Sequence, residues 1–165
     1  MNDIRDKPNI TGLEIGSFEG MSARWLLDNI FTDPTSRLTC ADIFEVWPGY
    51  YAEGELLALF EKNMGEHRSR VTVHQGRTDA VLPQLRVSEQ MYDFIYIDGS
   101  HLAPDVLDDL VLSWKMLKPN GIMIFDDYGC AHLGVGKAVE VWKLCHDNGE
   151  WTLVHTGYQH VLRKN

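Results

Sequence analysis

Apolar and polar positions alternate along the chain with two different periods. Short, nearly continuous apolar runs predict strands buried on both faces, and segments with apolar residues at helical spacing separate them. The alternation from Ile10 to Cys145 is typical of an α/β fold with a parallel sheet between two layers of helices. The predicted strands are residues 13–15, 38–43, 71–75, 94–97 and 122–125. The predicted helices are residues 21–30, 53–64, 78–87, 103–117 and 135–146.

Turn residues separate several of these predicted elements. Pro119-Asn120-Gly121 predicts the end of the fourth helix, and Gly65 and Gly149 are suited to end the second and fifth. Two apolar runs, residues 151–155 and 158–162, flank Thr156-Gly157 and predict a closing antiparallel hairpin.

Length and composition predict one domain, spanning residues 1–165. The net charge of −9 disfavours nucleic acid, or any other broad polyanion, as a partner and favours a small molecule. No apolar run approaches the roughly 18 residues of a membrane span, and no secretory signal opens the chain, so we predict a cytoplasmic protein without a membrane partner. The three cysteines show no C-x-x-C spacing, which argues against a disulfide framework or a thiolate zinc site.

Residues 13–20, Leu-Glu-Ile-Gly-Ser-Phe-Glu-Gly, form an apolar strand followed by a glycine-rich turn that opens a helix. Such turns place backbone N–H groups at the carboxyl end of a parallel strand, where open α/β sheets bind ligands. The glycine spacing departs from G-x-G-x-x-G, so a dinucleotide pyrophosphate fits poorly. The segment resembles the first motif of class I S-adenosylmethionine (SAM) dependent methyltransferases, although a purely structural glycine turn is the alternative.

That resemblance implies a doubly wound, mostly parallel seven-stranded sheet with strand order 3-2-1-4-5-7-6 and the last strand antiparallel. It also implies that the N-terminal lid helices of many family members are absent here, because the first strand begins almost at once. SAM would be contacted by the first motif and the helix after it, at Glu14, Gly16, Ser17, Gly20 and Ser22.

Two further strand ends carry candidate cofactor contacts. Asp42 ends the second strand, where a carboxylate can accept hydrogen bonds from both ribose hydroxyls; alternatively it caps the next turn. The segment Gln75-Gly76-Arg77-Thr78-Asp79 resembles the adenine-contacting stretch of catechol-type O-methyltransferases, which implies that Thr78 and Asp79 contact adenine. Thr78 as a helix N-cap is the alternative. Trp47 or a tyrosine of the aromatic loop after Asp42 is a further candidate to cover the adenosine, and packing of these side chains against a helix is the alternative.

Three aspartates follow the fourth and fifth strands: Asp98, Asp126 and Asp127. These strands are neighbours in the implied fold, so the carboxylates emerge side by side and repel one another unless a cation lies between them. Mg²⁺ or a similar divalent cation, which prefers oxygen ligands, would relieve this repulsion and hold a substrate hydroxyl. Solvated loop aspartates are the alternative.

His101 lies three residues after Asp98, within reach of a hydroxyl held at that site. An imidazole there can take a proton near neutral pH, as a general base does. A structural histidine is the alternative. The Asp-x-x-His arrangement resembles that of macrocin-type sugar O-methyltransferases, which implies that Asp98 is a catalytic metal ligand and His101 the base.

Taken together, the motifs predict a SAM-dependent, metal-assisted O-methyltransferase that acts on a hydroxyl of a small molecule, such as a sugar, polyol or phenol. Two alternatives stay open: a non-catalytic SAM-binding module that needs a partner chain, and an NAD-dependent oxidoreductase. The glycine spacing and the lack of a Tyr-x-x-x-Lys pair disfavour the second alternative. The protein is also a candidate homo-oligomer.

Overall fold

A mixed sheet of seven strands forms the centre of the computed structural model, which describes residues 4–45 and 50–165. The strand order is β3-β2-β1-β4-β5-β7-β6. All neighbours from β3 to β5 are parallel, whereas β7 runs antiparallel to both β5 and β6. This order and the reversed strand confirm the predicted fold. The strands are β1 (Thr11–Ile15), β2 (Arg37–Asp42), β3 (Val71–Gln75), β4 (Tyr92–Ile97), β5 (Leu117–Phe125), β6 (Trp151–Thr156) and β7 (His160–Lys164).

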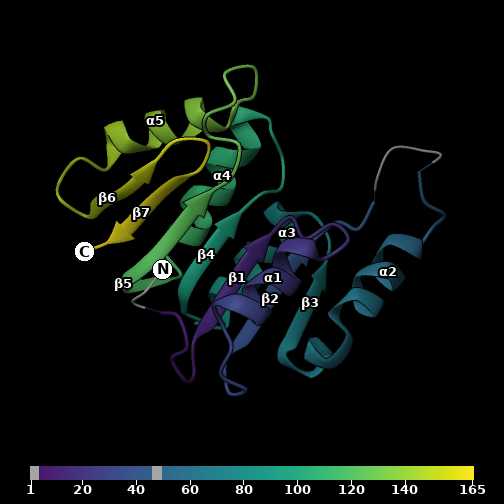
Figure 1. The fold of residues 1–165 in the computed structure, drawn as a ribbon. Coiled ribbons are helices and arrows are strands. Elements are labelled where there is room, and N and C mark those ends of the chain that lie inside the picture. The colour runs from purple at the N-terminus through teal and green to yellow at the C-terminus, as the bar shows by residue number, and fades with distance from the viewer. Residues whose placement is uncertain (1–3, 46–49) are drawn as a thin grey trace.

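Helices cover both faces of the sheet (Figure 1). Apolar residues of α3, α4 and α5 form one buried cluster with one face of the sheet, and those of α1 and α2 form a second cluster with the other face. Leu13 belongs to the first cluster and Phe94 to the second, and both are fully buried. The helices are α1 (Met21–Asn29), α2 (Glu55–Met64), α3 (Thr78–Val87), α4 (Ala103–Trp114) and α5 (Val135–Cys145), and a 3₁₀ helix, η1 (Gly65–Arg70), follows α2.

The end of α4 differs from the prediction. The helix ends at Trp114 and not at Leu117, and the Met116 N–H donates to the Ser113 carbonyl in a tight turn. Leu117 is already the first residue of β5 and pairs with Tyr92. The predicted stop, Pro119-Asn120-Gly121, therefore lies inside β5, where the register between β4 and β5 is irregular.

The second hairpin strand also starts later than predicted. It begins at His160, which pairs with Phe125 of β5, so Tyr158 and Gln159 belong to the turn before β7. Gly65 ends α2 as predicted, with φ of 49°, whereas α5 ends at Cys145, before Gly149 is reached. No helix among the described residues combines the length and the apolar character that crossing a bilayer requires.

Candidate active site

A cavity of about 450 Å³ opens at the carboxyl ends of β1, β2, β3 and β4. Open α/β sheets bind their ligands at this edge. Six residues predicted from the sequence line it: Gly16, Asp42, Thr78, Asp79, Asp98 and His101. Sequence reasoning missed six other polar or aromatic lining residues: Phe18, Glu45, Arg77, Ser100, Asp105 and Asp108. Trp47 lies outside the described residues.

Gly16 brings the turn after β1 against the end of β4. Its φ is 85°, in the left-handed region that favours glycine. A Cβ at this position would lie 2.2 Å from the carbonyl oxygen of Asp98. The two strand ends are joined next to this contact, where the Asp98 N–H donates to the Ile15 carbonyl at 2.8 Å. Glycine is therefore required for the close approach that places Asp98 at the cavity.

Asp42 is largely occupied by the protein itself. Its Oδ2 accepts the backbone N–H groups of Ser17 and Phe18 at 2.6 and 2.8 Å, and its Oδ1 accepts that of Phe44 at 2.6 Å. The carboxylate thus organises two turns, as in the capping alternative. A carboxylate has about four acceptor sites, so one site of Asp42 remains to accept a hydrogen bond from a ligand in the cavity.

The other first-motif residues lie behind the cavity wall. Glu14 and Ser17 are buried, and neither Glu14 Oε1 nor Ser17 Oγ has a hydrogen-bond partner among the described residues. Burial raises the pKa of Glu14 to about 7, although nearby hydroxyls and the Cys40 thiol oppose the shift. Gly20 has φ of 84° and packs closely against Met64. Its role in the structure is therefore to allow this backbone conformation and this close packing.

Ser22, at the start of α1, lines a second, more apolar cavity of about 340 Å³. This second cavity lies between α1, β4, β5 and the turn before β7, and Trp25, Tyr96 and Gln159 also line it. The structure therefore does not bring Ser22 together with the residues of the first cavity.

Thr78 and Asp79 stand at the start of α3, on the wall of the first cavity. The N-cap is Arg77 and not Thr78, so the capping alternative for Thr78 is wrong. The Thr78 side chain hydrogen-bonds to Asp109 of α4, and burial raises the pKa of Asp109 to about 6. Asp79 is exposed and pairs with Arg77, whose Nη2 lies 3.1 Å from Asp79 Oδ2.

Asp98 directly follows β4 and lies in a half-buried, negatively charged environment. Burial raises its pKa to about 7, and the charges of Asp126, Asp127 and Glu14 act in the same direction. The Tyr96 hydroxyl donates to Asp98 Oδ2 at 3.4 Å. The carboxylates after β4 and β5 thus repel one another, as expected from adjacent strand ends.

His101 and Asp127 complete a group with Asp98. One possible ligand atom from each of these three side chains lies within 4.8 Å of the others. His101 Nε2 is 2.9 Å from Asp127 Oδ2. The backbone of His101 is fixed from α5, because its carbonyl accepts the Gly134 N–H at 2.8 Å and a Cβ at Gly134 would collide with the same loop.

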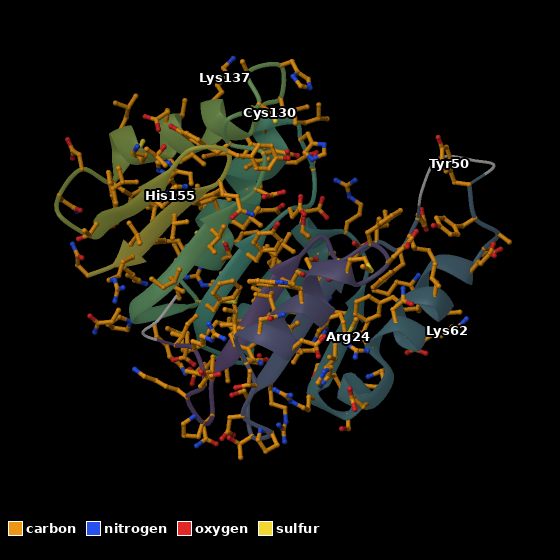
Figure 2. The ribbon with its side chains drawn as sticks, viewed as in Figure 1. Arg24, Tyr50, Lys62, Cys130, Lys137 and His155 are labelled. Carbon is orange, nitrogen blue, oxygen red and sulfur yellow. The ribbon has the colours of Figure 1, made fainter. Side chains whose placement is uncertain are left out.

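The turn before β7 holds the two aspartates that follow β5. Asp126 Oδ1 accepts a hydrogen bond from Gln159 Nε2 at 2.6 Å, and Asp127 Oδ1 accepts one from the Tyr158 hydroxyl. The Tyr158 bond lowers the pKa of Asp127. Cys130, labelled in Figure 2 in the loop after β5, places its Sγ 3.5 Å from Asp127 Oδ1. Asp126 lies outside the converging group of Asp98, His101 and Asp127.

The first cavity is strongly acidic. Six of its lining residues are aspartate or glutamate, whereas Arg77 is its one arginine or lysine among the described residues. Asp105 and Asp108 come from α4, and Ser100 donates to Asp105 Oδ2 at 2.7 Å. Such a cavity attracts cations and repels phosphates.

The model of a family described as a methyltransferase domain matches residues 13–128, more than half of the chain. This chain therefore belongs to the methyltransferase domain family. The match covers all the strand ends that line the first cavity and continues past Asp127. The predicted resemblance to class I SAM-dependent methyltransferases is confirmed at the level of family and fold.

Three individual proteins illustrate the similarity. Uncharacterized protein R132 of Acanthamoeba polyphaga mimivirus is 25% identical over 138 residues, with 74% of this chain and 53% of that protein covered. The chain thus spans about half the length of this curated relative. An O-methyltransferase from Bacillus cereus, solved in complex with S-adenosylhomocysteine (SAH), superposes with a TM-score of 0.72 at 16% identity, covering 94% of this chain and 74% of that chain.

The third is the MycE methyltransferase of mycinamycin biosynthesis, solved in complex with Mg, SAH and mycinamycin VI. It superposes with a TM-score of 0.68 at 16% identity, covering 99% of this chain and 46% of that chain. At these identities the two solved structures show a shared fold.

Proposed function

We propose that this protein transfers a methyl group from SAM to a hydroxyl of a small molecule, assisted by a divalent cation. The observation that carries the proposal is the group of Asp98, His101 and Asp127 at the edge of an acidic cavity, in a chain of the methyltransferase family. An imidazole and two carboxylates beside a cofactor cavity are suited to remove a proton from a hydroxyl.

The charge of the cavity supports SAM as the ligand. SAM carries a sulfonium cation and no phosphate, so the six carboxylates attract it. NAD carries a pyrophosphate, which the same carboxylates repel, and a single arginine offers little compensation. The NAD-dependent alternative is therefore not supported.

Cofactor contacts follow from the wall of the first cavity. The remaining acceptor site of Asp42 would take a ribose hydroxyl, with Glu45 beside it on the same wall. Thr78 and Asp79 would face the adenine. The turn from Gly16 to Phe18 would lie against the methionine end, with the buried atoms Glu14 Oε1 and Ser17 Oγ beneath it.

His101 would remove the proton of the acceptor hydroxyl. An ionised carboxylate can only accept hydrogen bonds, so Asp127 Oδ2 accepts the Nε2–H of a neutral His101 at 2.9 Å. The lone pair then lies on Nδ1, which would take the proton of the acceptor hydroxyl. Asp127 also stabilises the imidazolium that forms. The methyl carbon needs no activation by the protein, because the sulfonium is itself the leaving group.

The donor set fits a hard divalent cation such as Mg²⁺. Asp98 and Asp127 would hold it through their oxygens, with Asp126 next to them and His101 close by. A bound cation would polarise the acceptor hydroxyl and lower its pKa. The magnesium in the MycE complex supports this part of the proposal by similarity of fold.

The test is direct. Calorimetry should detect binding of SAM and SAH, and not of NAD. Radiolabelled SAM should then methylate at least one member of a panel of sugars, polyols and phenols, and EDTA should stop the transfer. Binding of SAM without turnover on any hydroxyl panel would instead favour the non-catalytic binding module, and full activity in EDTA would remove the cation from the mechanism.

A further inference from the structure

The turn before β7 reaches the acidic end of the sheet because of the strand register. Phe125, the last residue of β5, pairs with His160, the first residue of β7, in antiparallel orientation. Continuing this register by one and two residues places Gln159 opposite Asp126 and Tyr158 opposite Asp127. The hairpin that completes the sheet thus presents two polar side chains to the two aspartates.

Four separate contacts join this turn and the first residue of β7 to the loop after β5. Two are the side-chain bonds: Gln159 Nε2 to Asp126 Oδ1 at 2.6 Å, and the Tyr158 hydroxyl to Asp127 Oδ1. A third joins the backbones, where the Gly129 N–H donates to the Tyr158 carbonyl at 3.0 Å. The fourth is the stacking of Tyr128 on His160, with ring centroids 4.2 Å apart.

The backbones of the two segments also approach too closely for a side chain. A Cβ at Gly129 would lie 2.8 Å from the Gly157 carbonyl oxygen and 3.0 Å from Tyr158 Cα. The turn and the loop therefore form one packed unit, and the side-chain bonds within it have defined geometry.

We propose that Tyr158 and Gln159 are positioning residues, which hold Asp127 and Asp126 in the orientation that a divalent cation and His101 require. Tyr158 engages Oδ1 of Asp127 and so leaves Oδ2 facing His101 Nε2 at 2.9 Å. Gln159 engages Oδ1 of Asp126 and leaves its second oxygen unoccupied by this bond.

Both donors are neutral, and this distinguishes them from an arginine or lysine in the same place. A cationic partner would cancel the negative charge that attracts a cation, whereas a phenol and an amide orient the carboxylates and leave the charge intact. Groups that orient metal-binding side chains typically contribute 10- to 100-fold to metal affinity. The inference rests on the cation-assisted function proposed above.

The experiment measures Mn²⁺ binding to the full chain by electron paramagnetic resonance, together with SAM binding by calorimetry. Tyr158→Phe removes the hydroxyl that reaches Asp127, and Gln159→Leu removes the amide that reaches Asp126. Tyr128→Phe is the matched control, because its hydroxyl bonds to Glu140 of α5 at 2.8 Å and to neither aspartate.

Each of the first two variants should weaken Mn²⁺ binding about tenfold or more. SAM affinity in all three variants, and Mn²⁺ affinity in Tyr128→Phe, should stay within about twofold of the unmodified protein. If one of these two variants fails to fold, as judged by lost SAM binding, Mn²⁺ binding to the other variant decides whether the inference holds.

The alternatives are separable. Mn²⁺ affinities within about twofold in a folded Tyr158→Phe or Gln159→Leu protein would overturn the inference and leave the proposed function standing. An equal loss in Tyr128→Phe would also overturn it, because the effect would then be a general loosening of the loop. An unmodified protein that binds SAM and no Mn²⁺ would overturn both the inference and the cation in the proposed function.

Discussion

Replacing the buried Glu14 by glutamine tests the electrostatics of the first motif. Burial raises the pKa of Glu14 from its ordinary 4.5 to about 7. Between these two values the folded protein retains a proton that the unfolded chain has released. The free energy of unfolding therefore falls as the pH rises from about 4.5 to 7 and is lowest, for this group, above pH 7.

The magnitude follows from the shift. One pKa unit corresponds to about 1.4 kcal/mol, so Glu14 should remove about 3 kcal/mol of stability between pH 5 and pH 8. Glutamine has nearly the same shape and does not titrate, and its amide can donate to the unpartnered Ser17 Oγ. Glu14→Gln should thus be close to the unmodified protein in stability at pH 5 and about 3 kcal/mol more stable at pH 8.

Urea denaturation at both pH values gives the comparison. Asp109 also has a raised pKa, but it is present in both proteins and cancels in the difference. Asp98 does not cancel fully, because the charge of Glu14 helps to raise its pKa; replacing Glu14 lowers the pKa of Asp98 and acts in the same direction as the loss of Glu14 itself. Glu53→Gln, on an exposed glutamate, is the matched control for the loss of a carboxylate. If the stability difference for Glu14→Gln is the same at pH 5 and pH 8, Glu14 is already ionised in the folded protein and the reasoning fails.

Three other predictions concern the cavity edge. Gly16→Ala should lower the free energy of unfolding in urea by more than about 2 kcal/mol, because strain in the left-handed backbone adds to a collision with the Asp98 carbonyl. Gly149→Ala is the control, with φ of 83° and open space around it, and should lower the free energy of unfolding by about 1 to 2 kcal/mol. His101→Ala should keep SAM affinity within about twofold in calorimetry and lower methyl transfer by about 10²- to 10⁴-fold; a loss of only a few-fold would assign the proton to another group. EDTA should abolish transfer and leave SAM binding intact, with Mg²⁺ restoring the rate, and this prediction fails if EDTA has no effect.

The strand ends could be predicted because their signals are local. The sheet order followed from family resemblance, and Gly16, Asp42 and Asp98 each stand directly after a short apolar run. Parallel strands bring such positions to one edge whatever the details of packing. For this reason the cavity wall contains six of the predicted residues.

The partners of those residues could not be predicted, because they depend on contacts between distant segments. Tyr158 and Asp127 are 31 residues apart, and their bond exists only because β7 pairs with β5 in one register. The sequence pattern predicted Tyr158 as part of a strand, whereas it lies in the turn before β7. Asp42 shows the same limit. A carboxylate at a strand end can bind a ligand or the N–H groups of the protein's own turns, and only the three N–H contacts in the structure distinguish these two roles.

Under the proposed function, the acidity of the first cavity has a consequence for the end of each catalytic cycle. Methyl transfer converts a sulfonium into an uncharged thioether, so the ligand loses one positive charge while it is still bound. The six carboxylates that attract SAM have no such attraction for the sulfur of SAH. The negative charge of the cavity thus favours the exchange of SAH for SAM. Raising the salt concentration should reduce the difference between the affinities of the protein for SAM and SAH.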